Sequence, residues 1–120
     1  MKDADVHLGI TLSFVNDDIR KLWEPRASTV ADRLRILKEA HKLGIYTWVS
    51  MEPVIVPEEA LSVVDVAHDF VNFWKVGKLN HNKKVEDSVD WARFRDDVTN
   101  RLHRFRAKYY IKNDLVSFDS

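Results

Sequence analysis

The sequence contains no cysteine in its 120 residues, which excludes disulfides, thiolate nucleophiles and cysteine-held clusters within this chain. It also lacks an uninterrupted apolar run of the ~18 residues that a membrane-spanning helix needs. The first residues, MKDADVHL, have no apolar core of a signal peptide. Lysine and arginine number 19, as do aspartate and glutamate, so no global charge favours nucleic acid or a membrane surface. We therefore expect a cytoplasmic protein without a membrane partner.

Three signatures of self-contained enzymes are missing as well. The chain has no glycine-rich phosphate-binding loop, no HExxH zinc motif and no plausible Ser/His/Asp order. Nothing in these residues therefore indicates a hydrolase that works alone. With 45% hydrophobic residues, the chain matches one ordinary domain, residues 1–120, with a single core.

Four extended segments alternate with three amphipathic helical ones. Ser28 or Thr29 can cap the first helix, Gly44 can end it, and Pro53 and Pro57 are expected to stop the second strand. The expected strands are residues 6–15, 45–52, 71–79 and 109–112, and the expected helices run from about 29 to 43, through Ala60 to Ala67, and from Trp91 to Phe105.

This alternation is typical of βαβ units, and it predicts an α/β fold with a parallel sheet. Four strands can form a small open sheet or half of a TIM-type (β/α) barrel. One face of the first two strands is small and polar, where a sheet covered by helices on both sides would be apolar. The half barrel is therefore favoured. The polar positions are Gly9, Thr11, Ser13, Ser50 and Glu52.

Ligands of parallel sheets bind beyond the carboxyl ends of the strands. Ser13, Glu52 and the segment from Lys78 to His81 fall there. The Ser13 hydroxyl could equally be an ordinary satisfied strand residue. A carboxylate at the position of Glu52 is expected to reach solvent, to meet Lys75 or Lys78, or to contact a ligand.

Glu24 and Arg33 are spaced so that a loop can fold back on the first turn of a helix. We interpret this pair as a structural clamp, because a carboxylate bound to a guanidinium fixes loop geometry without chemistry.

Two basic segments have both a functional and an ordinary interpretation. The loop NHNKK could bind a metal or a phosphate through His81, Lys83 and Lys84, but a single loop histidine is more often a surface residue. The arginines near residue 104 could contact nucleic acid, but cations are also common where a helix ends. Asp96 and Asp97, one turn upstream, dilute that basic patch.

The stretch ITLSFVNDDIRKLWEPRASTVADRLRILKEAHKLGIYTWVSMEPVI carries a more specific pattern. It resembles the C-terminal half of a radical S-adenosylmethionine protein of the spore photoproduct lyase or DNA repair photolyase-like family. The likeness rests on Ser13, Glu24-Pro25, Arg33, Gly44 and Glu52-Pro53, and it extends more loosely over FWKVGKLNHNKK and YYIKNDL.

The resemblance implies a partial barrel of six strands, a [4Fe-4S] cluster on a CxxxCxxC loop, and S-adenosylmethionine across the strand ends. It assigns Ser13 to S-adenosylmethionine and places Glu52 beside that cofactor. The family usually has alanine at the position of Glu52, so the role of this side chain is open. The chain lacks CxxxCxxC, so the resemblance predicts a lyase-like enzyme half that is not catalytic alone.

Such a half could be a fragmentary gene product, a truncated chain or one piece of a split protein. Its expected partner is an N-terminal, cluster-bearing half, or a second copy of itself, because half a barrel leaves strand edges unpaired. The alternative is a stand-alone α/β binding or interaction module. Nucleic acid is a further possible partner, through the parent family's chemistry or the basic helix end.

Overall fold

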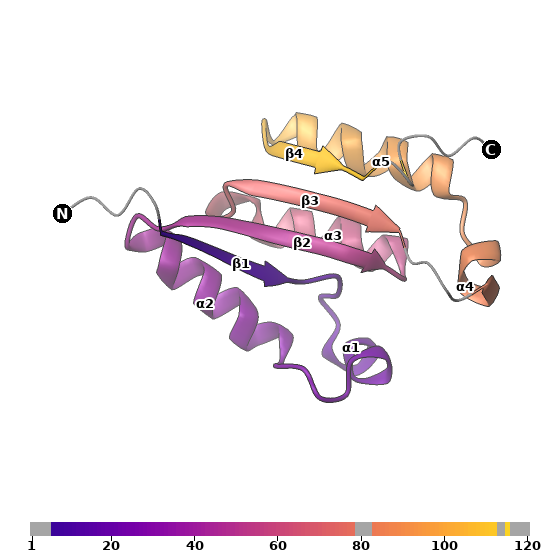
Figure 1. Cartoon of the computed structure of the whole chain (residues 1–120), viewed down its shortest axis with the longest axis horizontal. Coiled ribbons are helices and arrows are strands. Elements are labelled where there is room, and N and C mark those ends of the chain that lie inside the picture. The colour runs from indigo at the N-terminus through magenta and orange to yellow at the C-terminus, as the bar shows by residue number, and fades with distance from the viewer. Residues whose placement is uncertain (1–5, 79–82, 113–114, 116–120) are drawn as a thin grey trace.

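The computed structural model describes residues 6–78, 83–112 and 115, which form a four-stranded sheet with helices packed on one side (Figure 1). The strands are β1 (His7–Thr11), β2 (Tyr46–Val54), β3 (Phe73–Lys78) and β4 (Lys108–Ile111). The helices are α1 (Asp17–Trp23), α2 (Val30–Lys42), α3 (Pro57–Ala67), the short 3-10 helix η1 (His68–Phe70), α4 (Lys83–Ser88) and α5 (Trp91–Arg104).

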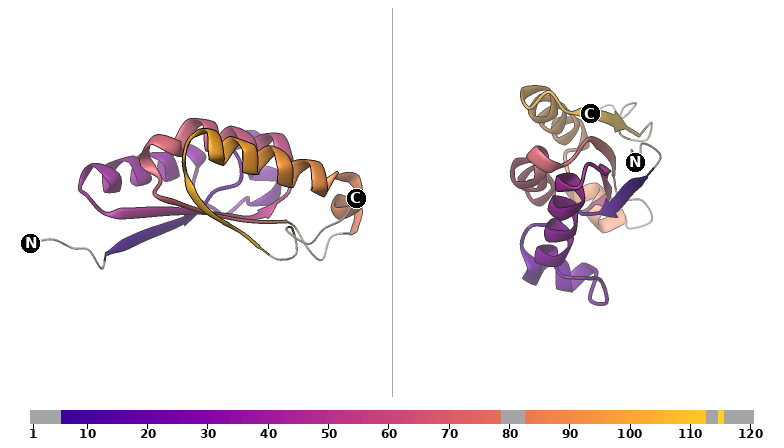
Figure 2. Two further views of the ribbon diagram at one scale, coloured as in Figure 1. Left: turned by 90° about the horizontal axis from the view of Figure 1, so that it is seen from above. Right: turned by 90° about the vertical axis from the view of Figure 1, so that its left-hand side faces the viewer.

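All neighbouring strands are parallel, and their order in the sheet is β1-β2-β3-β4, the same as in the chain. Each connection therefore adds one strand at the same edge. The helices α2, α3 and α5 lie on one side of the sheet, and none of the described helices lies on the other side (Figure 2). The predicted α/β fold with parallel strands is confirmed.

The core lies between the sheet and this helix layer. Every second residue of β2 and β3 points into it, including Val49, Met51, Trp74 and Val76, which are fully buried. The apolar faces of the helices are buried against the sheet, in α3 through Ala60, Val63, Val64 and Ala67 and in α5 through Trp91, Phe94, Val98 and Leu102. The periodicity of about 3.6 residues thus identified the faces that pack on the sheet.

Polar side chains cap the first turns of two long helices. The Thr29 side chain accepts a hydrogen bond from the Asp32 amide at the start of α2, and Asp90 accepts one from the Arg93 amide at the start of α5. Gly44, which follows the last residues of α2, has a φ of +81°. Glycine adopts this left-handed conformation without the steric cost that other residues meet, so the helix ends there.

The strand boundaries differ from the predicted ones. The first strand is shorter, because β1 ends at Thr11, and the next three residues are all buried instead of alternating. The second strand is longer, since β2 continues through Pro53 to Val54. Its pairing with β3 becomes irregular between Met51 and Val54, which accommodates a residue that has no N–H to donate.

Two short helices were predicted as loops. The loop expected after the first strand contains α1, and the polar segment expected before the last helix contains α4. Helix α1 begins at the cap Asn16, whose side chain accepts hydrogen bonds from the amides of Asp18 and Ile19.

Candidate functional site

The carboxyl ends of all four strands lie along one edge of the sheet, because the strands are parallel. Glu52 lies near the end of β2, Lys78 ends β3, and Lys112 directly follows β4. Glu52, Gly77 and Lys112 each follow one of the paired residues Met51, Val76 and Ile111, and the side chains of Glu52 and Lys112 meet over Gly77 on the side away from the helices.

Glu52 and Lys112 form an ion pair that spans this row. The pair crosses the backbone of β3 at Gly77, where an added Cβ would lie 2.9 Å from Lys112 Cδ and 3.2 Å from Glu52 Cγ. The absence of a side chain at Gly77 thus lets a carboxylate of β2 meet an ammonium group that lies two strands away. Both partners keep solvent contact, with 27% of the Glu52 side chain and 38% of the Lys112 side chain exposed.

Lys78 has a different environment. Its ammonium group lies 3.2 Å from Glu86 Oε1 and 5.7 Å from the centre of the Trp91 ring. The Trp91 indole N–H donates to the Glu86 carbonyl oxygen at 3.0 Å. Only 11% of the Lys78 side chain is exposed, so these contacts tie the end of β3 to α4 and α5. Leu79, Asn80 and His81, which complete the segment singled out in the sequence, lie outside the described residues.

Ser13 lies two residues beyond β1 and is 1% exposed. Its hydroxyl has no hydrogen-bond partner within the part of the chain that the structure describes. The chain turns directly after it, where the amides of Val15 and Asn16 donate to Glu59 Oε1 at 2.9 and 2.7 Å. Ser13 and Glu52 thus belong to neighbouring strand ends, but only Glu52 presents its polar atoms to solvent.

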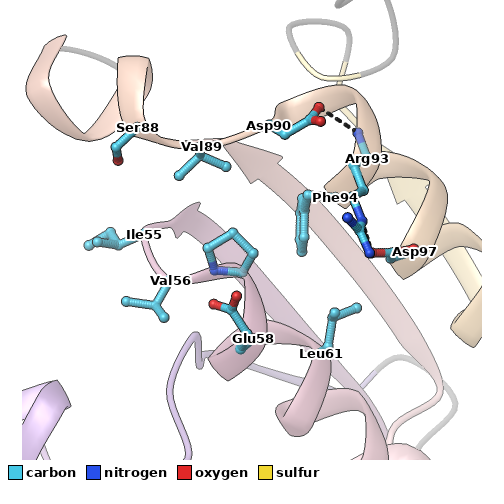
Figure 3. Close-up of a pocket in the computed structure, with 11 residues that line it drawn as sticks. Ile55, Val56, Glu58, Leu61, Ser88, Val89, Asp90, Arg93, Phe94 and Asp97 are labelled. Carbon is cyan, nitrogen blue, oxygen red and sulfur yellow. Dashed lines mark hydrogen bonds and ion pairs between the residues drawn. The ribbon is translucent and has the colours of Figure 1, made fainter. Parts of the chain in front are cut away.

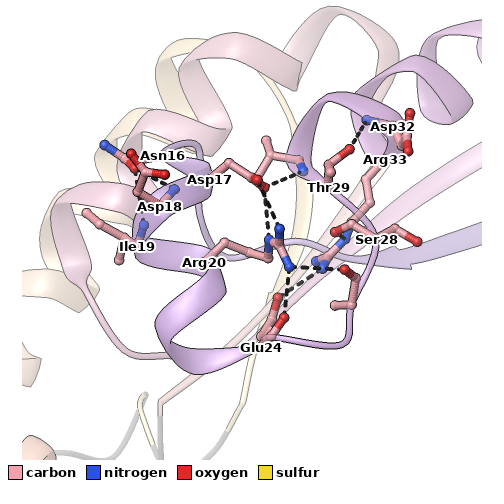
Figure 4. A network of polar contacts seen from close by, with 12 residues as sticks. Asn16, Asp17, Asp18, Ile19, Arg20, Glu24, Ser28, Thr29, Asp32 and Arg33 are labelled. Atoms are coloured by element: carbon pink, nitrogen blue, oxygen red, sulfur yellow. Dashed lines mark hydrogen bonds and ion pairs between the residues drawn. The ribbon is translucent and has the colours of Figure 1, made fainter.

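Arg33 donates to three acceptors at the base of the loop that follows β1 (Figure 4). Its Nη2 lies 3.0 Å from Glu24 Oε1, its Nη1 lies 2.9 Å from the Thr11 carbonyl oxygen, and its Nε lies 3.1 Å from the Ser28 carbonyl oxygen. The side chains of Arg33 and Glu24 are 9% and 23% exposed. This pair connects α2, the loop before it and the last residue of β1.

A second arginine in this network escaped the sequence analysis. Arg20 of α1 is buried, and it binds both oxygens of Asp17 at 2.9 Å while also donating to the carbonyls of Glu24 and Ala27. The hydrogen bond from Arg20, together with one from the Val30 amide, lowers the pKa of Asp17 from 3.8 to about 2. Its neighbour Asp17 raises the pKa of Arg20. A buried arginine at this position has no hydrophobic signal, which explains why it was missed.

A pocket of about 610 Å³ lies on the helix side, between the first turns of α3 and α5 (Figure 3). Apolar side chains line its wall, including Val56, Leu61 and Phe94, and the carboxylates of Glu58, Asp90 and Asp97 lie around it. Asp90 caps α5 and Asp97 pairs with Arg93 at 3.7 Å, so two of the three acids already serve the helix. No sequence motif pointed to this pocket.

The proposed metal or phosphate loop is divided by the structure. His81 lies outside the described residues, while Lys83 and Lys84 begin α4. Within the described ranges, no three His, Cys, Asp or Glu side chains gather as metal ligands would. At the basic end of α5, Arg101 pairs with Asp65 of α3 at 2.9 Å, which gives this arginine a structural role.

Across the described residues, no helix is both long and apolar enough to span a bilayer. The sequence matches no protein-family model, no curated protein and no solved structure.

Proposed function

We propose that this chain contributes three consecutive β/α units and a fourth strand to a parallel (β/α) barrel, and forms part of a ligand site with the carboxyl ends of its strands. The observation that carries this proposal is the strand order β1-β2-β3-β4 with the helices on one side. Doubly wound sheets reverse their strand order and thereby place helices on both faces. A sheet wound in one direction leaves its second face for the interior of a barrel.

Further β/α units would pair with the free edges of β1 and β4. Parallel sheets are seldom left uncovered on one face, which supports a closure of this kind. The resemblance to radical S-adenosylmethionine proteins implies that these further units belong to a cluster-bearing half. It also implies that the ligand is S-adenosylmethionine. The chain then provides one wall of the cofactor site and is not catalytic alone.

The side chains at the strand ends fit part of S-adenosylmethionine. The carboxylate of Glu52 can accept hydrogen bonds from the ammonium group of its methionine moiety, and Lys112 can pair with the carboxylate of the same moiety. Both groups are partly exposed and face away from the helices. A cofactor contact of Ser13 stays a prediction, and the burial of its hydroxyl does not support it. The chain has no thiolate for an iron–sulfur cluster, so no step through a cluster is assigned to its residues.

A titration of the isotope-labelled chain with S-adenosylmethionine, followed by NMR, tests this proposal. We expect amide shifts at Glu52, Gly77 and Lys112, with millimolar affinity because the site is only part of a larger one. The Glu52→Gln variant should weaken these shifts. The control Glu39→Gln changes an exposed carboxylate on α2 and should leave them unchanged. Shifts confined to the helix side, or none at saturating cofactor, would contradict the proposed site.

The alternative function is a stand-alone binding module. It is favoured by the core, in which large side chains such as Trp74, Trp91 and Phe14 are at most 1% exposed without any partner chain. A chain with such a core can fold alone, so the binding experiment on the isolated chain is valid under either interpretation.

A further inference from the structure

The uncovered side of the sheet, which we term the open face, carries an ordered set of aromatic and basic side chains. Side chains alternate along a strand, and paired residues of neighbouring parallel strands point to the same side. Since Trp74 and Val76 point into the core, Phe73 and Lys75 lie on the open face. The register then assigns to this face Trp48, Ser50, Lys108 and Tyr110.

The aromatic residues of the open face form a row. Trp48 of β2 is paired with Phe73 of β3, so the two positions are direct neighbours on this face, and the Trp48 ring leans over Gly9 of β1. Neither is fully buried. One row further towards the start of the strands, the rings of His7 and Tyr46 lie 4.8 Å apart. Together these rings provide flat apolar surface that a planar molecule can cover.

Two lysines lie on the same face, next to these aromatic residues. Lys108 is paired with Phe73, and Lys75 lies one row further along, between Ser50 and Tyr110. Within the described residues, neither lysine forms an ion pair. Among the described strand residues of the open face, the acidic one is Glu52, and its carboxylate is paired with Lys112. The centre of the open face therefore carries a local positive charge.

We infer that the open face binds an anionic molecule with a planar aromatic ring, which stacks on Trp48 and Phe73 and places its anionic group at Lys75. The ring surface and the positive charge each match one part of such a molecule, and the charge selects it over a neutral ring. The hydroxyls of Ser50 and Tyr110 flank Lys75 and can donate to the same anionic group. Tyr110 is 46% exposed, so its side chain is accessible to a ligand.

This inference rests on the proposed function, to which it adds the substrate class. The strand ends would hold the cofactor at Glu52, and the adjoining open face would hold the molecule that is acted upon. The two sites use different side chains, so variants can separate them.

The experiment is a titration of the labelled chain with adenosine 5′-monophosphate, an aromatic phosphate, and with 2-naphthoate, an aromatic carboxylate. Adenosine, 2-naphthamide and inorganic phosphate serve as comparison ligands. We expect both aromatic anions to shift the Trp48 indole N–H and the Lys75 amide, and to bind more tightly than the three comparison ligands. If only one anion does so, the anionic group is identified as phosphate or carboxylate.

Lys75→Gln should weaken the binding of the aromatic anions about tenfold, which corresponds to the loss of one charge-assisted contact. Lys38→Gln removes the same charge from an exposed position of α2 and should have no effect. Phe73→Leu keeps an apolar side chain but removes a ring, so it should also weaken binding. If the NMR spectrum of Lys75→Gln shows that this variant does not fold, the binding measured for Phe73→Leu decides whether the inference holds.

Equal binding of the neutral and anionic ligands, equal effects of Lys75→Gln and Lys38→Gln, or no saturable shift at the open face would overturn the inference. A failed titration with S-adenosylmethionine beside a successful one with an aromatic anion would reject the proposed cofactor and keep the open-face site. The reverse result would keep the cofactor and reject the open-face site.

Discussion

The indole ring of Trp48 lies directly over Gly9, its register partner on β1. A Cβ atom added to Gly9 would lie 2.2 Å from Trp48 Cε2 and Cζ2. No van der Waals contact is that short, so the position tolerates no side chain while the ring keeps its place. The glycine therefore determines where the largest aromatic side chain of the open face lies.

Gly9→Ala should displace the Trp48 ring into solvent. We expect a red-shifted tryptophan emission with stronger acrylamide quenching, and a loss of roughly 1 to 3 kcal/mol in the free energy of unfolding, because the added methyl group cannot be accommodated without a shift. The same glycine change in a Trp48→Phe background should leave the emission unaltered. An unchanged spectrum of Gly9→Ala itself would show that the ring does not rest on this glycine.

The clamp formed by Glu24 and Arg33 should be asymmetric. Arg33→Ala removes three hydrogen bonds of a largely buried guanidinium and should cost roughly 1 to 3 kcal/mol in urea denaturation. Glu24→Ala removes one of these bonds, so it should cost less. The double variant should cost less than the sum of the two, by about 0.5 kcal/mol or more, since contacting residues are coupled.

Arg35→Ala is the matched control for the clamp. Arg35 lies on the same helix, but its side chain is 58% exposed and its ion pairs with Asp32 and Glu39 are 3.7 and 3.5 Å long. Its removal should therefore cost less than ~1 kcal/mol. Strictly additive losses for Glu24 and Arg33 would mean that the two side chains do not interact in solution.

The lowered pKa of Asp17 predicts a loss of stability in acid. Because the carboxylate is favoured in the folded state, its contribution is complete above the unfolded pKa of about 4, and it is lost as the pH falls to about 2. The difference in Tm between the native chain and Asp17→Asn should therefore be largest near neutral pH and should shrink between pH ~4 and ~2.

Asp18→Asn provides the control for this titration. Asp18 occupies the same first turn of α1 as Asp17, so both carboxylates interact with the same helix dipole. The side chain of Asp17 is the one that Arg20 binds. The difference in Tm between Asp18→Asn and the native chain should therefore stay constant through the acid range. The same pH dependence in both variants would assign the effect to the helix dipole.

Among the described residues, β1 and β4 each have one edge without a partner strand, which predicts self-association of the isolated chain. An exposed strand edge offers free N–H and C=O groups to another strand, and here both edges belong to a sheet with one uncovered face. We expect sedimentation equilibrium to detect dimers or larger species at high concentration. Thr11→Lys places a charge on the exposed β1 edge and should shift the equilibrium towards monomer. A clean monomer of the native chain at every concentration would speak against this expectation.

The sequence predicted the elements whose packing is apolar. Helix α3 could be read from Ala60, Val63, Val64 and Ala67, because all four face the sheet at helical spacing. Helix α1 could not be read in this way, since its fully buried side chain is Arg20. Helix α4 has no buried residue among those described, and so offers no periodic pattern.

For the candidate site, the sequence predicted which residues lie at the strand ends better than it predicted the burial and the partners of their side chains. Alternation placed Ser13 and Glu52 on one polar face, and for Glu52 this is what the structure has. For Ser13 the alternation fails, because Leu12, Ser13 and Phe14 are all buried where the chain leaves the sheet. The partner of Glu52 was expected at Lys75 or Lys78, and it is Lys112. That contact depends on the order of β4 in the sheet and on Gly77, and neither could be predicted from local sequence.

The strand order also determines how far apart in the chain the partners of the sheet lie. In the described strands, paired residues are separated by roughly 25 to 40 positions along the chain. Forming each ladder thus requires closure of one loop of moderate length, whose entropic cost grows only slowly with the number of residues. The β2–β3 ladder has the shortest loop and lies at the centre of the sheet. We expect it to form first, with β1 and β4 added on either side as separate, later events.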